Sequence, residues 1–435
     1  MTRFRKLLLF EKMEKFEVCS VDALKDGELK DFELNDDVKI LLLHKDGKFF
    51  ASGTKCTHYG APLIKGSLCG TKVRCPWHGA NFDLTTGDIE EFPGCDSIAS
   101  YSTEVQNGKV FVTLDPAVAK SGKRVMKFAP YNPTQDQRTF VILGGGAAAC
   151  IASQTLRENG FQGKVVMISQ EKYVPYDRVK LSKIPDSDAA KIAIRSPEFY
   201  ENANIELRLG KVVEKVDCST KTVTLSGETL KYDSLLVCTG GKPRTIPNVE
   251  KCKGVHVLRT PDDGKSLMED AEGKNVVIIG AGFIGMELSC ALIKKSKSVT
   301  VLGRDKNPLQ NVFGEEIGKM LLKLHETNGV VYKSGVTVKD FKCDGDRISN
   351  VILDNGETLS AEVLLVSIGV VPATEFLKGS SVKMDQNGYV EVDEVSCLVK
   401  SLDLIVMNLF FSLCVQVALT YLQLVILPTF LYLCP

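Results

Sequence analysis

The first 115 residues show short apolar or alternating runs that are separated by turn-forming residues. Residues 39–52 read KILLLHKDGKFFAS, residues 72–77 read KVRCPW, and residues 109–114 read KVFVTL. Runs of this length, bounded by Gly, Asp and Pro, are typical of β-strands. The pattern therefore predicts a small all-β domain over residues 15–115.

Beyond residue 138 the pattern changes to apolar strands that alternate with helical segments. Residues 116–137, rich in Lys, Pro, Asn and Gln, are expected to form a linker ahead of this change. An apolar strand over residues 139–143 (TFVIL) leads through glycines into a helix, and the same order returns after residues 275–279 (NVVII). Each copy predicts a βαβ unit, so the chain is expected to be multidomain, with the all-β domain followed by an α/β part.

Both strand-to-helix turns carry glycine patterns typical of dinucleotide binding. The first is Gly144-x-Gly146-x-x-Ala149, and Glu171 ends the following strand about twenty residues on. Glycines at such a turn let backbone N–H groups approach a pyrophosphate, and an acidic side chain at that distance can hold a ribose. The second turn repeats the pattern, with its glycines at Gly280, Gly282 and Gly285.

The segments after the two turns also match in register. Gly227-Glu-Thr-Leu precedes Gly240 by thirteen residues, and Gly356-Glu-Thr-Leu precedes Gly369 by the same interval. A repeated spacing of this kind indicates an internal duplication. Two nucleotide sites in one chain are therefore expected.

Two cysteine and histidine pairs lie within the predicted β-domain. Cys56-Thr-His58 is followed by Cys75-Pro-Trp-His78. A Rieske [2Fe-2S] cluster needs two thiolates on one iron and two imidazoles on the other. Two loops that each supply one thiolate and one imidazole satisfy this requirement. The alternatives are a zinc site, which more often uses C-x-x-C pairs, or buried cysteines beside unrelated histidines.

The segment CPWHGANFDLTTGD (75–88) resembles Rieske ferredoxins and oxygenase-type Rieske domains more than respiratory ones. Respiratory types add a cysteine to each loop and hydroxyl donors to the cluster, where this chain has Trp77, Ala80 and Phe82. Fewer donors stabilise the reduced cluster less. The resemblance therefore implies a potential toward the low end of the Rieske range, which is roughly −150 to +300 mV.

Residues 138–395 resemble the flavoprotein reductases with two dinucleotide-binding domains. The resemblance implies an FAD domain whose first part is residues 138–262, an inserted NAD(P) domain over 263–372, and an incomplete return over 373–396. For Arg178 and Lys183 a solvated charged loop is the alternative. The resemblance places Gly144, Gly146, Ala149 and Glu171 at the FAD pyrophosphate and ribose, Arg178, Lys183, Thr239 and Gly240 beside the flavin, and Gly280, Gly282, Gly285, Glu287 and Gly369 at the nicotinamide nucleotide.

The second ribose position departs from an NADH pattern. Gly303 stands where an acidic residue is expected, and Arg304 follows it. A missing carboxylate removes repulsion against a 2′-phosphate, and an arginine can pair with that group. We therefore expect a modest preference for NADPH.

Composition and charge indicate which partners and which cellular compartment are expected. Lys plus Arg equals Asp plus Glu at 54 each, so no overall field favours nucleic acid. Most of the 14 cysteines lie singly in apolar runs, which fits a reducing, intracellular compartment better than a disulfide scaffold. The N-terminal MTRFRKLLLF is too short for a secretory signal, and both a cytoplasmic and a mitochondrial location stay open.

The apolar tail over residues 397–435 breaks the family pattern. After GYVEVDE (388–394) the family returns to the FAD domain with a glycine-aspartate motif and a further domain, and neither is found here. Residues 404–435 carry no charge, so they are expected to be either a transmembrane segment or an aberrant C-terminal sequence. A membrane association is expected only through these residues. In both cases the FAD site is expected to lack one wall.

The combined pattern resembles the Rieske-bearing members of the apoptosis-inducing factor family. The chain has no C-x4-C pair, which excludes the thiol exchange of disulfide reductases. The resemblance implies an enzyme that passes electrons from NAD(P)H through FAD to its own [2Fe-2S] cluster and on to an unknown acceptor. The alternatives are a reductase and ferredoxin in one chain serving an oxygenase, and a truncated non-catalytic protein. The sequence leaves the oligomeric state open.

Overall fold

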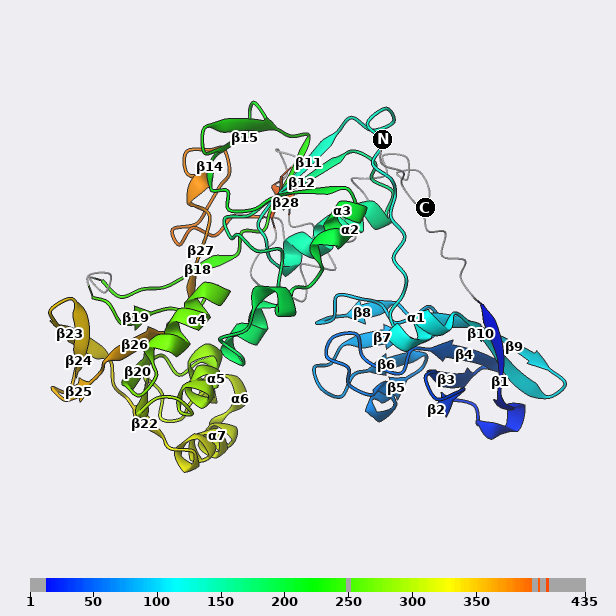
Figure 1. Ribbon diagram of the computed structural model, residues 1–435, viewed down its shortest axis with the longest axis horizontal. Coiled ribbons are helices and arrows are strands. Elements are labelled where there is room, and N and C mark those ends of the chain that lie inside the picture. The colour runs from blue at the N-terminus through cyan, green and yellow to red at the C-terminus, as the bar shows by residue number, and fades with distance from the viewer. Residues whose placement is uncertain (1–12, 248–251, 393–397, 400–403, 407–435) are drawn as a thin grey trace. The chain divides into compact units, whose positions relative to one another are not determined.

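The structure is a computed structural model that describes residues 13–247, 252–392, 398–399 and 404–406. It divides into two compact units, Met1–Lys127 and Phe128–Pro435. Figure 1 labels most of the strands and helices of the two units.

The first unit is built from two antiparallel sheets. The larger sheet has the order β1-β10-β9-β4-β3-β2, and the smaller has the order β5-β6-β7-β8. This arrangement confirms the all-β prediction. The bounds are β1 Glu14–Ser20, β2 Leu29–Glu33, β3 Lys39–Lys45, β4 Lys48–Ser52, β5 Ser67–Cys69, β6 Lys72–Arg74, β7 Asn81–Asp83, β8 Ile89–Glu91, β9 Ser100–Gln106 and β10 Lys109–Leu114.

Strand β3 is buried on both faces, which explains its continuous apolar run. Alternate side chains of a strand point to opposite faces. Ile40 and Leu42 pack in one hydrophobic core of the unit, while Leu41 and Leu43 pack in a second core that also holds Cys56. The strand therefore ties the larger sheet to the part of the unit that carries the two cysteine and histidine loops.

The stretch 116–137, predicted to be a linker, is shared between the two units. Its first part forms helix α1 (Pro116–Ser121), capped by the Asp115 side chain, and the Gly122 carbonyl accepts a hydrogen bond from the Ala99 N–H at 2.9 Å. In its second part, Phe128 packs on a core of the second unit and the Asn132 N–H donates to the Gln162 carbonyl at 2.9 Å. Both ends of the stretch are thus held by hydrogen bonds.

The second unit contains two largely parallel sheets, each joined to its own helices, and the β28–β29 pair of the first sheet is antiparallel. The first sheet has the order β13-β12-β11-β17-β29-β28, and the second has the order β19-β26-β20-β21-β22. The bounds in the first half are β11 Thr139–Leu143, α2 Ala147–Glu158, β12 Lys164–Ile168, α3 Pro197–Asn202, β13 Ile205–Arg208 and β17 Ser234–Val237. Those in the second half are β19 Val255–His256, α4 Pro261–Asp270, β20 Asn275–Ile279, α5 Phe283–Leu292, β21 Ser298–Gly303, α6 Gln310–Phe313, α7 Glu315–Thr327, β22 Val330–Ser334 and β26 Val363–Val366.

The predicted duplication is visible in the smaller sheets. Each half has a three-stranded antiparallel sheet, and a two-stranded sheet of β18 and β27 connects the halves. Strand β19 pairs with β26, so the second half begins at Val255, ahead of the predicted boundary at 263. The bounds are β14 Val213–Asp217, β15 Thr222–Leu225, β16 Glu228–Lys231, β18 Gly241–Pro243, β23 Val338–Asp344, β24 Arg347–Leu353, β25 Thr358–Ser360 and β27 Val370–Pro372.

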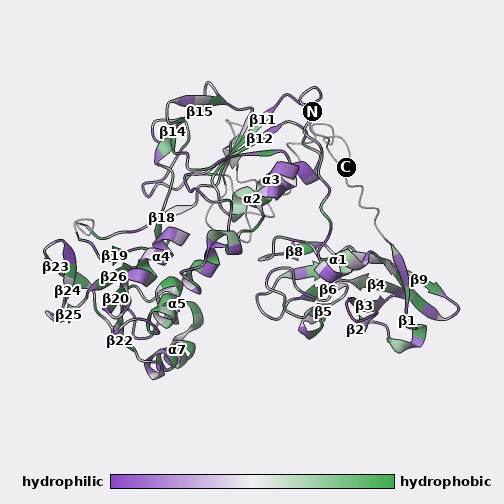
Figure 2. Ribbon diagram, viewed as in Figure 1, coloured by the Kyte–Doolittle hydropathy of each residue, from purple (hydrophilic) through white to green (hydrophobic). Residues whose placement is uncertain are grey.

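Hydrophobic residues form much of the second sheet and of α5, the helix that follows the second nucleotide turn. Figure 2 shows α5 as a largely hydrophobic helix, and Met286, Leu288 and Leu292 are its large buried side chains. The second half of this unit also contains a disulfide between Cys252 and Cys343, whose Cα atoms lie 6.3 Å apart. The cysteine spacing did not predict this pair.

After residue 397 the first sheet is extended by two short strands, β28 (Leu398–Val399) and β29 (Leu404–Val406). The expectation that the FAD site lacks one wall stays a prediction. Strand β29 pairs in parallel with β17, with Leu404 opposite Leu235 and Val406 opposite Val237. No helix within the described ranges is long and apolar enough to cross a membrane, and most of the predicted tail, residues 407–435, lies outside those ranges.

Candidate cofactor sites

The two cysteine and histidine loops of the first unit share one backbone pattern. Cys56 follows β4, and Cys75 follows β6 directly. The Cys56 N–H donates to the Ala61 carbonyl and the Cys75 N–H to the Ala80 carbonyl, both at 2.8 Å. In each loop the N–H of the glycine four residues after the cysteine donates to the cysteine carbonyl, and Gly60 and Gly79 have φ values of 80° and 78°. Positive φ favours glycine, so each loop is closed by the same turn.

The four predicted ligands converge at the tips of these loops. Cys56 and Cys75 are buried at 3% and 4% exposure, whereas His78 is exposed. The rings of His58 and His78 lie 4.9 Å apart between centroids in an edge-on arrangement. Burial, together with a hydrogen bond to Cys75, raises the pKa of the Cys56 thiol. Two buried sulfurs beside two imidazoles fit the donor set of a Rieske cluster, whose binding would keep the thiols deprotonated.

Residues around the loops affect how such a cluster would be held. The Tyr59 ring stacks on His58 with centroids 3.8 Å apart. Ala80 and Phe82 are fully buried and carry no hydroxyl, as the sequence comparison with respiratory domains anticipated. No three His, Cys, Asp or Glu side chains of the described residues are grouped around a single metal position.

In the second unit, the first glycine of each nucleotide turn is required by its backbone. Gly144 has φ of 133°, and a Cβ there would lie 2.3 Å from the Cys238 carbonyl oxygen. Gly280 has φ of 107°, and a Cβ there would lie 2.2 Å from the Ser367 carbonyl oxygen. Both positions therefore exclude side chains, because the loop after β11 passes directly over β17 and the loop after β20 passes over β26.

The second glycines face open space at helix N-termini. Gly146 is the N-cap of α2 and Gly282 is the N-cap of α5. A Cβ at either position would meet no atom within 4 Å. These open cradles, with free N–H groups of the first helical turn, fit an approaching pyrophosphate.

The third position of the pattern differs between the halves. Ala149 is fully buried in α2. At Gly285, in contrast, a Cβ would lie 2.0 Å from the Gly280 carbonyl oxygen. The second turn is thus packed more closely against its helix than the first, which accounts for alanine in one copy and glycine in the other.

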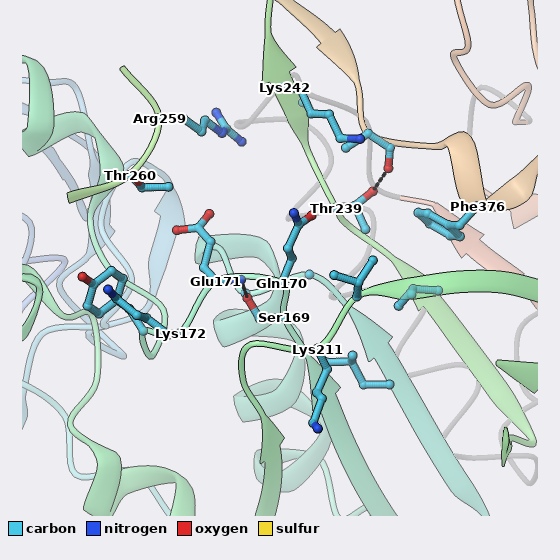
Figure 3. Close-up of a pocket in the computed structure, with 18 of the residues that line it drawn as sticks. Ser169, Gln170, Glu171, Lys172, Lys211, Thr239, Lys242, Arg259, Thr260 and Phe376 are labelled. Atoms are coloured by element: carbon cyan, nitrogen blue, oxygen red, sulfur yellow. Dashed lines mark hydrogen bonds between the residues drawn. The ribbon is translucent and has the colours of Figure 1, made fainter. Parts of the chain in front are cut away.

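A cavity of about 700 Å³ opens beside the first turn (Figure 3). A volume of this size is ordinary for a cofactor site. The sequence did not predict that Ser169 lines this cavity. A Cβ at position 145 would lie 2.3 Å from the Ser169 Oγ, so the run of three glycines at 144–146 is the only sequence feature that reflects this contact. The lining includes Gly144, Gly145, Ser169, Gln170, Glu171, Lys172, Lys211, Thr239, Lys242, Arg259, Thr260, Ala373 and Phe376.

Glu171 and Arg178 meet in this region, although the sequence placed them at different parts of FAD. An Arg178 nitrogen lies 2.7 Å from the Glu171 carboxylate, and the Tyr176 hydroxyl donates to the same carboxylate at 2.6 Å. The charged-loop alternative for Arg178 is therefore too simple. Burial and the nearby Arg178 lower the pKa of Arg259 to about 10. Figure 3 shows the Glu171 carboxylate directed toward the side of the cavity that holds Arg259 and Thr260.

Thr239 and Gly240 join the cavity to the segment after β27. The Thr239 hydroxyl donates to the Ala373 carbonyl at 2.8 Å, and the Ala373 N–H donates to the Gly240 carbonyl at 3.0 Å. Gly240 has φ of 65°, and its counterpart Gly369 has φ of 94°. The two glycines that the duplication pairs thus share a left-handed backbone.

Lys183 and Glu287 form an ion pair between the two halves of the unit. The Lys183 ammonium lies 3.0 Å from both carboxylate oxygens, and the Ser182 hydroxyl also donates to Glu287. Lys183 follows the 3-10 helix Arg178–Ser182, and Glu287 lies on α5. The structure therefore brings together the residue predicted beside the flavin and the residue predicted near the nicotinamide.

Tyr332 explains why Gly303 replaces an acidic residue. A Cβ at position 303 would lie 2.0 Å from the Tyr332 hydroxyl oxygen, and this hydroxyl donates to the Asp305 carbonyl at 3.0 Å. Burial and Asp305 raise the pKa of Tyr332 to about 12, so it stays a neutral donor. Arg304 is exposed at the end of β21. The space of an acidic side chain is thus filled by a neutral hydroxyl from β22.

Comparison with known families and proteins agrees with this geometry. Residues 138–399 match the family model described as pyridine nucleotide-disulphide oxidoreductase, and residues 14–102 match the Rieske [2Fe-2S] domain. The second match favours a cluster over the zinc alternative. The pair of matches confirms the predicted order of an all-β domain and a reductase part.

Similar proteins include several reductases. Apoptosis-inducing factor 3 of Homo sapiens is 36% identical over 388 residues, which are 87% of this chain and 63% of that protein. The chain thus spans less than two thirds of that relative. Rhodocoxin reductase of Rhodococcus erythropolis is 33% identical over 59% of this chain and 61% of its own length. The covalent putidaredoxin reductase–putidaredoxin complex has a chain that is 26% identical with a TM-score of 0.60, covering 67% of this chain and 74% of that chain.

Proposed function

We propose that this chain, which belongs to the pyridine nucleotide-disulphide oxidoreductase family and carries an N-terminal Rieske [2Fe-2S] domain, oxidises NAD(P)H and delivers the electrons to its own cluster. The observation that supports the proposal is the presence, in one polypeptide, of four convergent side chains of the types that hold such a cluster and two open glycine turns at helix N-termini. The acceptor beyond the cluster is expected to take one electron at a time.

The residues present fit the three groups that this activity needs. Cys56, His58, Cys75 and His78 would hold the [2Fe-2S] cluster, and the cavity beside Gly144 would hold FAD. FAD would supply a hydride acceptor that can release single electrons to an iron-sulfur centre. Gly280, Gly282 and Gly285 would hold the nicotinamide nucleotide on α5.

The residues around these sites have distinct proposed roles. Lys183 and Glu287 would orient the two rings, because their ion pair links the loop beside the flavin to the nucleotide helix. Arg304 would bind a 2′-phosphate, since the Tyr332 hydroxyl at the ribose position carries no repelling charge. The exposed His78 side of the cluster loops, rather than the buried sulfur side, would face the acceptor.

A second candidate function is service to a separate oxygenase. The ferredoxin–NAD(+) reductase component of the p-cumate 2,3-dioxygenase system of Pseudomonas putida is 33% identical over 247 residues, which are 55% of this chain and 60% of that protein. By this likeness the chain would unite a reductase and a ferredoxin. Reduction of an added oxygenase Rieske component, dependent on this protein and NAD(P)H, would favour it.

The test of the main proposal is anaerobic reduction of the purified full chain. Optical and EPR spectra recorded before and after NADPH addition are expected to show bleaching of flavin absorption and a new reduced [2Fe-2S] signal. A flavin that bleaches while the cluster stays oxidised would contradict the electron route. A chain that carries the cluster and no flavin would instead support the non-catalytic alternative.

A matched pair of variants separates the cluster from the flavin. Cys56→Ser is expected to remove the cluster signal while flavin reduction by NADPH continues. Cys69→Ser, which changes an exposed free cysteine of the same domain, is expected to keep both. Loss of flavin reduction in Cys56→Ser alone would show that the two groups do not act in the proposed order.

A further inference from the structure

Cys290 and His325 form a close pair that the proposed electron route does not use. Cys290 lies on α5 and His325 on α7, and the distance from the cysteine Sγ to the histidine Nε2 is 3.3 Å. Cys290 is a free and exposed cysteine, whereas His325 is buried at 8% exposure. A solvent-accessible thiol is thus held against an imidazole that packing keeps in place.

The surroundings of His325 determine which ring nitrogen faces Cys290. Its Nδ1 lies 2.8 Å from the Leu321 carbonyl oxygen, and its Nε2 lies 3.3 Å from the Met286 carbonyl oxygen. A carbonyl oxygen only accepts hydrogen bonds, so Nδ1 donates to Leu321. With Nδ1 as the donor, Nε2 can accept the proton of the Cys290 thiol 3.3 Å away.

Positive charge is also concentrated directly after Cys290 in the chain. Lys294, Lys295 and Lys297 are exposed in the segment that follows α5. Lys295 forms an ion pair of 3.5 Å with Asp186. Exposed basic residues attract anionic reagents to the surface that carries them.

We infer that Cys290 is a site of reversible thiolation by an anionic low-molecular-weight disulfide of the glutathione type. The Cys290 thiol passes its proton to His325 Nε2 as its sulfur attacks one sulfur of the disulfide, and a new S–S bond forms as the original S–S bond breaks. The departing thiolate takes a proton from the His325 imidazolium, which becomes neutral. One disulfide and one thiol enter and one mixed disulfide and one thiol leave, so no further oxidant is needed.

The test uses the full, cofactor-loaded protein and glutathione disulfide as the probe. Peptide mass spectrometry would give the rate of mixed-disulfide formation at Cys290 and, in the same sample, at the exposed Cys69. Cys290 is expected to react about tenfold faster, because the His325 imidazole beside it can accept the thiol proton during the attack. Equal rates at the two cysteines would overturn the inference without any variant.

Two variants assign the effect to the pair. His325→Gln is expected to slow Cys290 to the rate of Cys69, because an amide cannot accept the proton of the thiol. Circular dichroism must show the native fold, and a folded variant with an unchanged Cys290 rate would refute the role of His325. Cys290→Ser is expected to abolish labelling on α5, and labelling that persists on the same peptide would show that another group reacts.

Discussion

The Lys183 ammonium lies 3.0 Å from both carboxylate oxygens of Glu287, a residue 104 positions further along the chain. This ion pair joins the end of the 3-10 helix Arg178–Ser182 to α5, the helix that follows the second nucleotide turn. Both side chains are partly exposed, at 45% and 33%. A pair this accessible contributes little to stability. We expect the pair instead to position the bound flavin and nicotinamide rings.

Glu287→Gln is expected to slow flavin reduction by NADPH by about tenfold while the unfolding midpoint stays nearly unchanged, since a misplaced ring costs rate rather than stability. Stopped-flow measurement of flavin absorbance checks this. The control is Glu269→Gln, which removes an exposed pair with Lys265 at 4.0 Å on α4. A rate for Glu287→Gln that equals that of the control would contradict the positioning role.

Gly146→Ala and Gly282→Ala test the two nucleotide sites independently. Neither added Cβ meets an atom within 4 Å, so both variants should fold, yet each methyl group would occupy the cradle of a pyrophosphate. We expect Gly146→Ala to purify with less FAD. Gly282→Ala should retain FAD and show a KM for NADPH raised by about tenfold. The reverse assignment of the two effects would show that the sites are exchanged.

Arg304→Ala tests the preference between nicotinamide nucleotides. We expect kcat/KM with NADPH to fall by about tenfold, equivalent to about 1.4 kcal/mol, and kcat/KM with NADH to change little, because only the 2′-phosphate pairs with arginine. Lys306→Ala, which removes a nearby exposed cation, serves as the control. Equal losses with both nucleotides would refute a role in 2′-phosphate binding.

Asp270 is expected to stabilise the second half of the reductase unit in a pH-dependent manner. Burial alone raises its pKa, but hydrogen bonds from Lys274, His256 and Arg347 outweigh burial and lower the pKa to about 2. A lowered pKa stabilises the fold above the unfolded value of 3.8, and this contribution is lost as pH falls through about 2.

The corresponding variant is Asp270→Asn, measured by urea unfolding with circular dichroism. We expect a loss of about 2 kcal/mol near pH 7 that shrinks as the pH falls below about 4. Asp344→Asn, at an exposed position on β23, should cost far less. A loss that already varies between about pH 8 and pH 6 would point to another titrating group.

Local spacing was enough to predict much of the architecture. The C-x-H and C-x-x-H pairs and both glycine patterns lie within a few residues of sequence, so their spacing can be read directly, although the first glycine of each turn is required by a strand about ninety residues away. The register of Gly240 with Gly369 likewise anticipated their shared left-handed backbone. The Rieske and reductase parts could be recognised for this reason.

Contacts between distant segments could not be predicted in the same way. The Tyr332 hydroxyl that displaces an acid at Gly303 comes from the next strand of the sheet, and Arg259 reaches the cavity from the start of the second half. The approach of Cys252 to Cys343 spans 91 residues. Each depends on how elements pack, which composition and periodicity do not specify.

The pairing of β29 with β17 has a consequence for solubility. Leu235, Leu236 and Val237 are buried and apolar, and without a neighbour on that side their strand would be an open edge of the first sheet. Unprotected apolar edges recruit strands from other molecules and promote aggregation. Three residues, Leu404–Val406, thus shield a surface on which copies of this chain would otherwise assemble.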